Sequence, residues 1–287
     1  MIPAQFDYIS AKSIDEAVTL LAKHKDDAKL LAGGHSLLPA MKLRLMQPKV
    51  LIDISRIKDL NYIREDKGQI RIGAMTTHFQ IESSELLRRV CPLLRETASH
   101  LGDVQVRNRG TIGGSIAHAD PAADWPAAIL ALDAEIIVAG GKGQRSIKAD
   151  QFFEEMFKTA LQPSEIVREI AFATPKGPGQ AYLKFRHPAS GFAVVGVAVS
   201  LSRDGSGKCQ SAGVGITGVS PTPYRAKAVE DALKGSNLDT KSLSAAASHA
   251  TGKIEVNSDL FASAEYRKHL AEVYTRRALE MAVSRTK

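Results

Sequence analysis

LGDVQVRNRGTIGGSIAHADPAADWP, residues 101–126, is the stretch that decides the fold. Two adjacent glycines, Gly113 and Gly114, stand in it between the hydroxyl residues Thr111 and Ser115. Glycine has no Cβ to restrict φ or to keep a ligand away from the backbone. Successive exposed N–H groups form an anion-binding nest, to which flanking hydroxyls add donors. Residues 102–125 are therefore expected to form a loop that binds an anionic group.

A second glycine pair lies upstream in AGGHS, residues 32–36. Residues 29–32 are predicted to form a short buried strand that leads into it, and residues 37–44 a short helix that follows it. Strand, glycine loop and helix in this order are typical of a phosphate-binding turn. Two such loops, about eighty residues apart, are expected to hold the two phosphates of one dinucleotide. A lone glycine pair more often forms only a tight turn, and this alternative stays open.

A third glycine motif, GVGITG at residues 213–218, matches the GxGxxG pattern of dinucleotide-binding folds. That pattern requires a helix to begin inside the motif. Pro221 and Pro223 follow directly and exclude a helix there. We interpret this match as a coincidence of composition.

The composition is that of an ordinary globular protein. The 287 residues are 44% hydrophobic and 24% charged, enough for two domains with cores of their own. The net charge is +7, but the basic residues are scattered and aromatic residues make up only 6%. This pattern argues against a nucleic-acid-binding surface.

Cysteine usage restricts the chemistry further. Cys91 and Cys209 are the only two cysteines, and there is no CxxC motif. A disulfide framework and a cysteine-ligated iron–sulfur cluster within this chain are thereby excluded. The N-terminal residues show no signal-peptide pattern, and no apolar run approaches the ~18 residues of a spanning helix. We expect a cytoplasmic protein without an intrinsic membrane segment, unless partners carry it to a membrane.

The pattern of predicted elements changes at PKGPG, residues 175–179. After it, two long β-prone runs at residues 192–202 and 208–217 precede three helices. These helices are expected at residues 225–234, 242–251 and 264–284. Strands followed by segregated helices indicate an α+β fold, here with domains at residues 1–177 and 178–287.

Three segments carry a resemblance to a known family: LLAGGHSLLPAMKLR at residues 30–44, DVQVRNRGTIGGSIAHADPAAD at residues 103–124, and AEYRK at residues 264–268. From residue 6 to about residue 280 the chain resembles the FAD-binding medium subunits of molybdenum hydroxylases. Within them it is most similar to the medium subunit of carbon monoxide dehydrogenase, which is related to the flavin domain of xanthine dehydrogenase.

The resemblance implies a two-part FAD-binding domain of the vanillyl-alcohol-oxidase (PCMH) type, with subdomains at about residues 1–55 and 56–177. A smaller α+β domain with a three-stranded or similar antiparallel sheet and a helical bundle would follow. The N–H groups of residues 33–36 and 112–115 would bind the pyrophosphate of non-covalent FAD. The expected cofactor-binding residues are Ala32, Gly33, Gly34, His35, Ser36, Thr111, Ile112, Gly113, Gly114, Ser115, Asp124, Val167 and Lys184. No catalytic or metal-ligating residue is expected in this chain.

The resemblance implies particular roles for Val167 and Lys184. Val167 matches a residue whose backbone meets the isoalloxazine ring in relatives. Lys184 matches a residue near the ring, where a cation would stabilise the anionic reduced flavin and raise its potential. A solvent-facing lysine on a strand edge is the alternative for Lys184. The sequence departs from the carbon monoxide enzymes just beyond it, at residues 185–191. Asp124 precedes a predicted helix and could act only as its N-cap.

The resemblance also implies an assembly. A large subunit would carry the molybdenum-pterin, a small subunit the [2Fe–2S] clusters, and two such heterotrimers would form a dimer. FAD would accept electrons from the clusters and pass them to an external acceptor. The substrate, whether carbon monoxide, an aromatic heterocycle or an aldehyde, would be bound by the large subunit. Two alternatives are a stand-alone flavin oxidase with FAD attached covalently to His35, and a binding module without cofactor.

Overall fold

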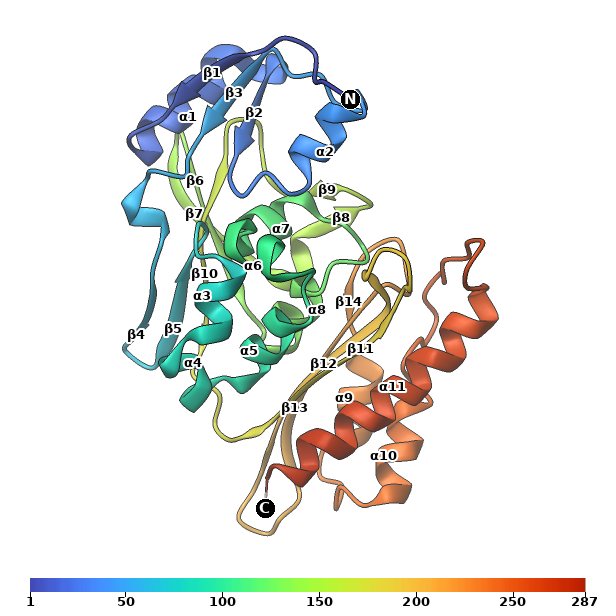
Figure 1. Ribbon diagram of the computed structural model, residues 1–287. Coiled ribbons are helices and arrows are strands. Elements are labelled where there is room, and N and C mark those ends of the chain that lie inside the picture. The colour runs from blue at the N-terminus through green and yellow to red at the C-terminus, as the bar shows by residue number, and fades with distance from the viewer. Residues whose placement is uncertain (287) are drawn as a thin grey trace.

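The N-terminal residues form a small parallel sheet covered by two helices. The computed structural model describes residues 1–286, and Figure 1 shows this sheet at one end of the molecule. Its strand order is β1–β3–β2, and every residue of the central strand is buried. Its elements are β1 (Asp7–Ser10), α1 (Ile14–His24), β2 (Ala28–Leu31), α2 (Leu37–Lys42) and β3 (Val50–Asp53). The Ser13 hydroxyl accepts a hydrogen bond from the Glu16 amide and so fixes where α1 begins.

A five-stranded antiparallel sheet follows, in the order β4–β5–β10–β6–β7. Its strands are β4 (Ile63–Asp66), β5 (Gln69–Gly73), β6 (Glu135–Gly140), β7 (Gly143–Lys148) and β10 (Ile166–Ala173). The helices inserted between its strands are α3 (His78–Ser83), α4 (Glu85–Val90), α5 (Pro92–Ser99), α6 (Val104–Arg109), α7 (Ile112–His118) and α8 (Trp125–Ala131). The strands β8 (Phe153–Glu155) and β9 (Lys158–Thr159) form a separate two-stranded sheet. The largest buried cluster of apolar side chains joins the sheet to these helices.

The C-terminal part is a four-stranded antiparallel sheet with three helices, which confirms the α+β prediction. The strands are β11 (Gly179–Arg186), β12 (Ala193–Arg203), β13 (Cys209–Thr217) and β14 (Tyr224–Arg225). The helices are α9 (Lys227–Leu233), α10 (Thr240–Ala247) and α11 (Ala264–Ser284). In Figure 1 these helices cover the outer face of the sheet, while α8 contacts β12 and β13. One sheet therefore has helices on both sides.

Helix α8 is buried along its whole length because it lies between two layers. It approaches β13 so closely that a Cβ on Gly213 or Gly215 would lie 2.0 Å from the carbonyl oxygen of Ala131 or Ala127. The GVGITG motif is thus part of a strand that packs on a helix, and no helix begins within it. The close packing of α8 on β13 explains why glycine stands at positions 213 and 215, and no bound nucleotide is needed to account for them.

The segment at residues 102–125 differs from the predicted loop, because it contains the short helices α6 and α7. Asp103 and Thr111 cap these helices through their side chains, which stabilises helix starts in a glycine-containing sequence. Only the connections between the helices are irregular, so the prediction of one open loop was wrong.

The helices were also compared with the requirements for crossing a bilayer. Within residues 1–286, none combines the length and the apolar character that a membrane span needs, and this includes α11, the longest of them.

The close approach of α8 and β13 gives a stability prediction. Gly215→Ala would place a methyl group against the Ala127 carbonyl, and we expect it to lower the free energy of unfolding by about 3 kcal/mol. Gly205→Ala is the control, because nothing lies within 4 Å of its Cβ position. Urea denaturation of both variants measures the difference, and equal effects would contradict this packing.

Candidate cofactor-binding site

The two glycine pairs that the sequence singled out lie next to each other. Residues 32–36 connect β2 to α2, and residues 112–115 form the first turn of α7. A Cβ on Gly33 would lie 2.3 Å from the Arg109 carbonyl oxygen and 2.8 Å from the Cα atom of Gly110. A Cβ on Gly114 would lie 3.6 Å from that of Ala32. Only glycine at position 33 lets the two backbones come this close.

The first loop presents backbone donors without acceptors. Among the described residues, the N–H groups of residues 33–36 have no hydrogen-bond acceptor. Gly34 has a φ of +77°, the left-handed conformation that helps successive N–H groups point to one side. The His35 ring folds back, with its Nδ1 atom 3.0 Å from the Gly33 carbonyl oxygen. Four adjacent unpaired donors at a partly exposed position form an anion-binding nest.

The second segment differs from its expectation. The amides of Ile112 and Gly113 donate to the carbonyl oxygens of Thr76 and Ala74, at 3.1 and 2.9 Å. The amides of Gly114 and Ser115 donate to Thr111, to its hydroxyl and its carbonyl oxygen. All four N–H groups are therefore already paired, because the segment is a capped helix start and not an open loop. What the segment can offer a ligand is the hydroxyls of Thr111 and Ser115 beside the first loop.

Asp124 and Lys184 meet as a buried ion pair. The ammonium Nζ of Lys184 lies 2.9 Å from Oδ2 of Asp124, and the two side chains are 1% and 3% exposed, Lys184 first. The Tyr182 hydroxyl donates to the same carboxylate, and Lys184 also donates to the His100 carbonyl oxygen at 3.2 Å. Burial raises the pKa of Asp124 and lowers that of Lys184, while their mutual attraction opposes both shifts.

This pair excludes a capping role for Asp124 and a surface position for Lys184. Asp124 does stand before α8, but its side chain makes no capping hydrogen bond. Lys184 is not a solvent-facing residue, because it is turned into the interior between β11 and α8. The ion pair connects the helical layer of the N-terminal part to the first strand of the C-terminal part. Val167 is buried in β10 opposite Val138, and its side chain belongs to the main core.

His78 was not singled out from the sequence, although it supports the second glycine segment. Its amide donates to the Gly110 carbonyl oxygen at 3.0 Å, and its Nδ1 atom accepts the Trp125 indole N–H at 3.1 Å. Burial lowers the pKa of His78 to about 3, so the ring is neutral. The capping box formed by Thr77 and Gln80 was the signal that could have placed His78 at a helix start.

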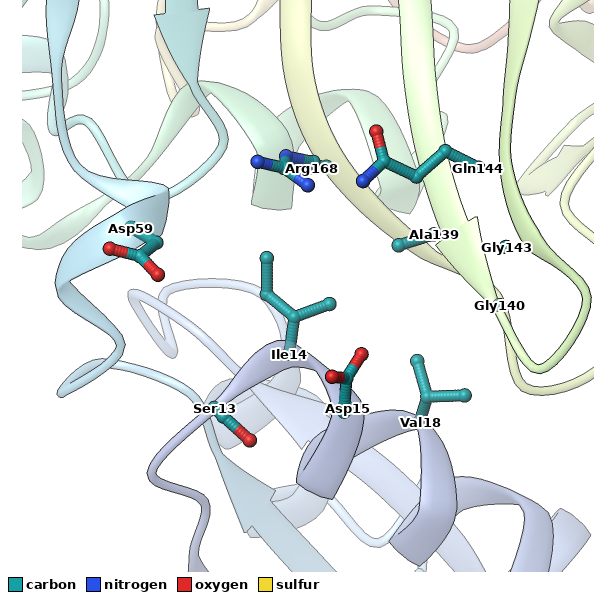
Figure 2. Close-up of a pocket in the computed structure, with 10 residues that line it drawn as sticks. All are labelled: Ser13, Ile14, Asp15, Val18, Asp59, Ala139, Gly140, Gly143, Gln144 and Arg168. Carbon is teal, nitrogen blue, oxygen red and sulfur yellow. The ribbon is translucent and has the colours of Figure 1, made fainter.

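A separate cavity of about 240 Å³ lies between the start of α1 and strands β6, β7 and β10. Figure 2 shows Arg168 and Gln144 pointing into it, opposite Asp15 and beside Asp59. None of the residues expected to bind the cofactor lines it, and it is smaller than the usual ligand pocket. It is therefore not the dinucleotide site. No group of three or more His, Cys, Asp or Glu residues within residues 1–286 could hold a metal ion.

Comparison with known proteins decides the family. Residues 4–175 match the profile of the FAD binding domain in molybdopterin dehydrogenase. Residues 180–282 match that of the CO dehydrogenase flavoprotein C-terminal domain. The chain belongs to this family of flavoprotein subunits. The FAD-binding match leaves a module without cofactor unsupported, and the comparisons give no support to a stand-alone oxidase with covalent FAD on His35.

Individual relatives agree with this assignment over the full chain. The carbon monoxide dehydrogenase medium chain of Hydrogenophaga pseudoflava is 42% identical, covering 99% of both chains. The glyceraldehyde dehydrogenase medium chain of Sulfolobus acidocaldarius is 35% identical, covering 98% of this chain and 99% of that one. A solved structure of carbon monoxide dehydrogenase from Hydrogenophaga pseudoflava superposes with a TM-score of 0.96 at 43% identity, covering 99% of both chains.

The neutral His78 makes stability depend on pH. Its pKa of about 3 in the folded chain lies below the ordinary value of 6.5, so only the unfolded chain takes up this proton near pH 5. The stabilisation is complete above pH 6.5 and is lost as the pH falls. We expect about 2 kcal/mol less stability at pH 5 than at pH 7 from this group. Urea denaturation followed by the fluorescence of Trp125 measures it.

His78→Asn is the matched variant for this measurement, because an amide oxygen can replace Nδ1 as the acceptor for Trp125. It removes the titrating group, so its stability should fall about 2 kcal/mol less between pH 7 and pH 5 than that of the wild type. The same pH dependence in both proteins would show that His78 is not the group responsible.

The buried ion pair predicts strong coupling between its members. Asp124→Asn leaves the Lys184 ammonium buried without its carboxylate, and we expect a loss of about 3–5 kcal/mol in the free energy of unfolding. Adding Lys184→Met should recover part of this loss, because no unpaired charge remains. Additive effects in this double-mutant cycle would contradict the pairing. The exposed pair of Lys158 and Glu155 serves as a control in which Lys158→Met changes little.

Proposed function

We propose that this chain is the medium subunit of a molybdenum hydroxylase and holds FAD non-covalently between its two glycine segments. The observation that carries the proposal is the row of four unpaired N–H groups at residues 33–36, placed against the start of α7. The pyrophosphate is the only doubly charged part of FAD, and it requires such a set of donors. The family to which the chain belongs supports the same cofactor.

Different residues of the chain would contact different parts of FAD. The amides of residues 33–36 donate to the phosphates, and the hydroxyls of Thr111 and Ser115 add donors from the opposite side. Backbone N–H groups serve this purpose well because they are fixed before the ligand arrives. Val167 would contact the flavin through its backbone, because its side chain is buried in the main core. Bound FAD supplies chemistry that accepts one electron at a time and releases two.

Asp124 and Lys184 act in this proposal as a fixed, overall neutral pair between the N-terminal and C-terminal parts of the chain. A buried ammonium that already has a carboxylate partner at 2.9 Å contributes less field to a flavin than a free one would. The pair therefore holds the two domains in register, and Lys184 raises the flavin potential less than a free lysine would. We place the domain boundary at residues 177–178, between the two matched profiles and just before β11 begins at Gly179.

Partner chains complete the electron path. We propose a large subunit with the molybdenum-pterin and a small subunit with [2Fe–2S] clusters, joined with this chain in a dimer of heterotrimers. Relatives called medium chains, one of a carbon monoxide dehydrogenase and one of a glyceraldehyde dehydrogenase, support an assembly of several chains. Their names differ in substrate although both align over the full chain. We infer that a partner chain selects the substrate and that this chain passes electrons from the clusters to an acceptor.

The test is the flavin content of the complex purified from its host. Acid precipitation should release one FAD per medium chain into the supernatant and leave no flavin fluorescence in the pellet. His35→Ala should still hold FAD, because the imidazole makes no bond to the flavin in this proposal. Flavin that stays in the pellet of the wild type but not of His35→Ala would instead establish a covalent link. A wild-type complex that lacks FAD and does not take it up would overturn the proposal.

A further inference from the structure

Arg267 in α11 is a buried arginine that binds two backbone carbonyl groups of the C-terminal sheet. Its Nη1 atom donates to the carbonyl oxygens of Val194 and Gly218, both at 2.8 Å. Its Nη2 atom pairs with Asp259, and the residue is only 5% exposed. Val194 is the second residue of β12, and Gly218 follows the last residue of β13. Arg267 therefore ties together the ends of two neighbouring strands.

The same strand ends hold the loop of residues 119–124, which connects α7 to α8. The Thr217 hydroxyl lies 2.7 and 2.8 Å from the carbonyl oxygens of Pro121 and Ala123. The Gly218 amide donates to Pro121, and the Ala193 amide donates to Ala122. Each carbonyl that Arg267 binds thus belongs to, or directly follows, a residue whose donor holds this loop.

The loop leads directly to the proposed flavin site. It begins where α7, the helix of the second glycine pair, ends, and it finishes at Asp124, which receives Lys184 and Tyr182. A side chain that fixes the strand ends fixes the position of the loop, of α7 and of the buried ion pair together. Loss of its charge would also leave the Val194 and Gly218 carbonyl oxygens without this donor in a buried place.

We propose that Arg267 is a positioning residue for the flavin: it acts from α11, through the ends of β12 and β13, on the loop that joins α7 to Asp124. This inference rests on the proposed function, because it assigns Arg267 to the support of the same site. A planar guanidinium suits the task, since one nitrogen can serve two carbonyl oxygens while another binds the carboxylate.

The test compares Arg267→Met with Arg203→Met in the complete complex. Arg203 is the matched control, because it also binds a backbone carbonyl, that of Gly207, but at the far end of β12. Both variants should lower the melting temperature. Only Arg267→Met should weaken FAD binding, by about tenfold, which is the size of effect that supporting residues have at metal sites. Only this variant should also change the visible circular dichroism of the bound flavin.

Arg267→Lys decides the matter if Arg267→Met does not assemble. The lysine ammonium keeps the charge and can donate to both carbonyl oxygens, but it lacks the planar arrangement of the guanidinium donors. The FAD affinity of Arg267→Lys should therefore fall below that of the wild type and of Arg203→Met. The circular dichroism of its bound flavin should change as well. FAD affinity and dichroism in the Arg267 variants equal to those of Arg203→Met would overturn the positioning role. A wild-type complex without FAD would instead overturn the proposed function, so the two failures are distinguishable.

Discussion

A buried pair of opposite charges, Asp124 and Lys184, joins the N-terminal and C-terminal parts of this chain. Neither the carboxylate of Asp124 nor the ammonium of Lys184 is stable away from water unless the other is present. One charge precedes a helix of the N-terminal part, and the other stands on the first strand of the C-terminal part. Docking of the C-terminal sheet on α8 in another register would leave both charges buried and unpaired. Tyr182 and the His100 carbonyl oxygen complete the set of partners that makes this burial tolerable.

The two glycine segments have different tasks. In the first, the four N–H groups of residues 33–36 have no acceptor in the part of the chain that the structure describes, which is costly in a folded protein unless a ligand or water binds them. In the second, residues 112–115 use all their N–H groups to begin a helix and to bond to residues 74 and 76. Residues 33–36 supply backbone donors, and the start of α7 supplies a rigid backbone with the hydroxyls of Thr111 and Ser115. Similar composition thus produced a nest in one place and a capped helix in the other.

Much of the fold could be predicted because long periodic segments fix their own structure. The strands β12 and β13 and the helix α11 lie within one residue of the expected ranges. The proline residues after GVGITG correctly predicted that no helix begins there. Helix α7 was not predicted because its two glycines lower helix propensity, and α6 because it is only six residues long, although Asp103 and Thr111 indicated where they begin. The pairing of Asp124 with Lys184 could not be predicted, since only tertiary packing brings residues 60 positions apart together. The assignment to FAD came from the two glycine segments and from the family they identify.

The central claim is that the N–H groups of residues 33–36 bind the pyrophosphate of FAD. Hydrogen–deuterium exchange tests this claim most directly. The complex should be compared before and after gentle removal of the flavin. We predict fast exchange at residues 33–36 without FAD and strong protection with it, because these amides have no acceptor within residues 1–286. Residues 112–115 should be protected in both states, since their amides are already bonded. Exchange at residues 33–36 that is the same with and without FAD would contradict the account.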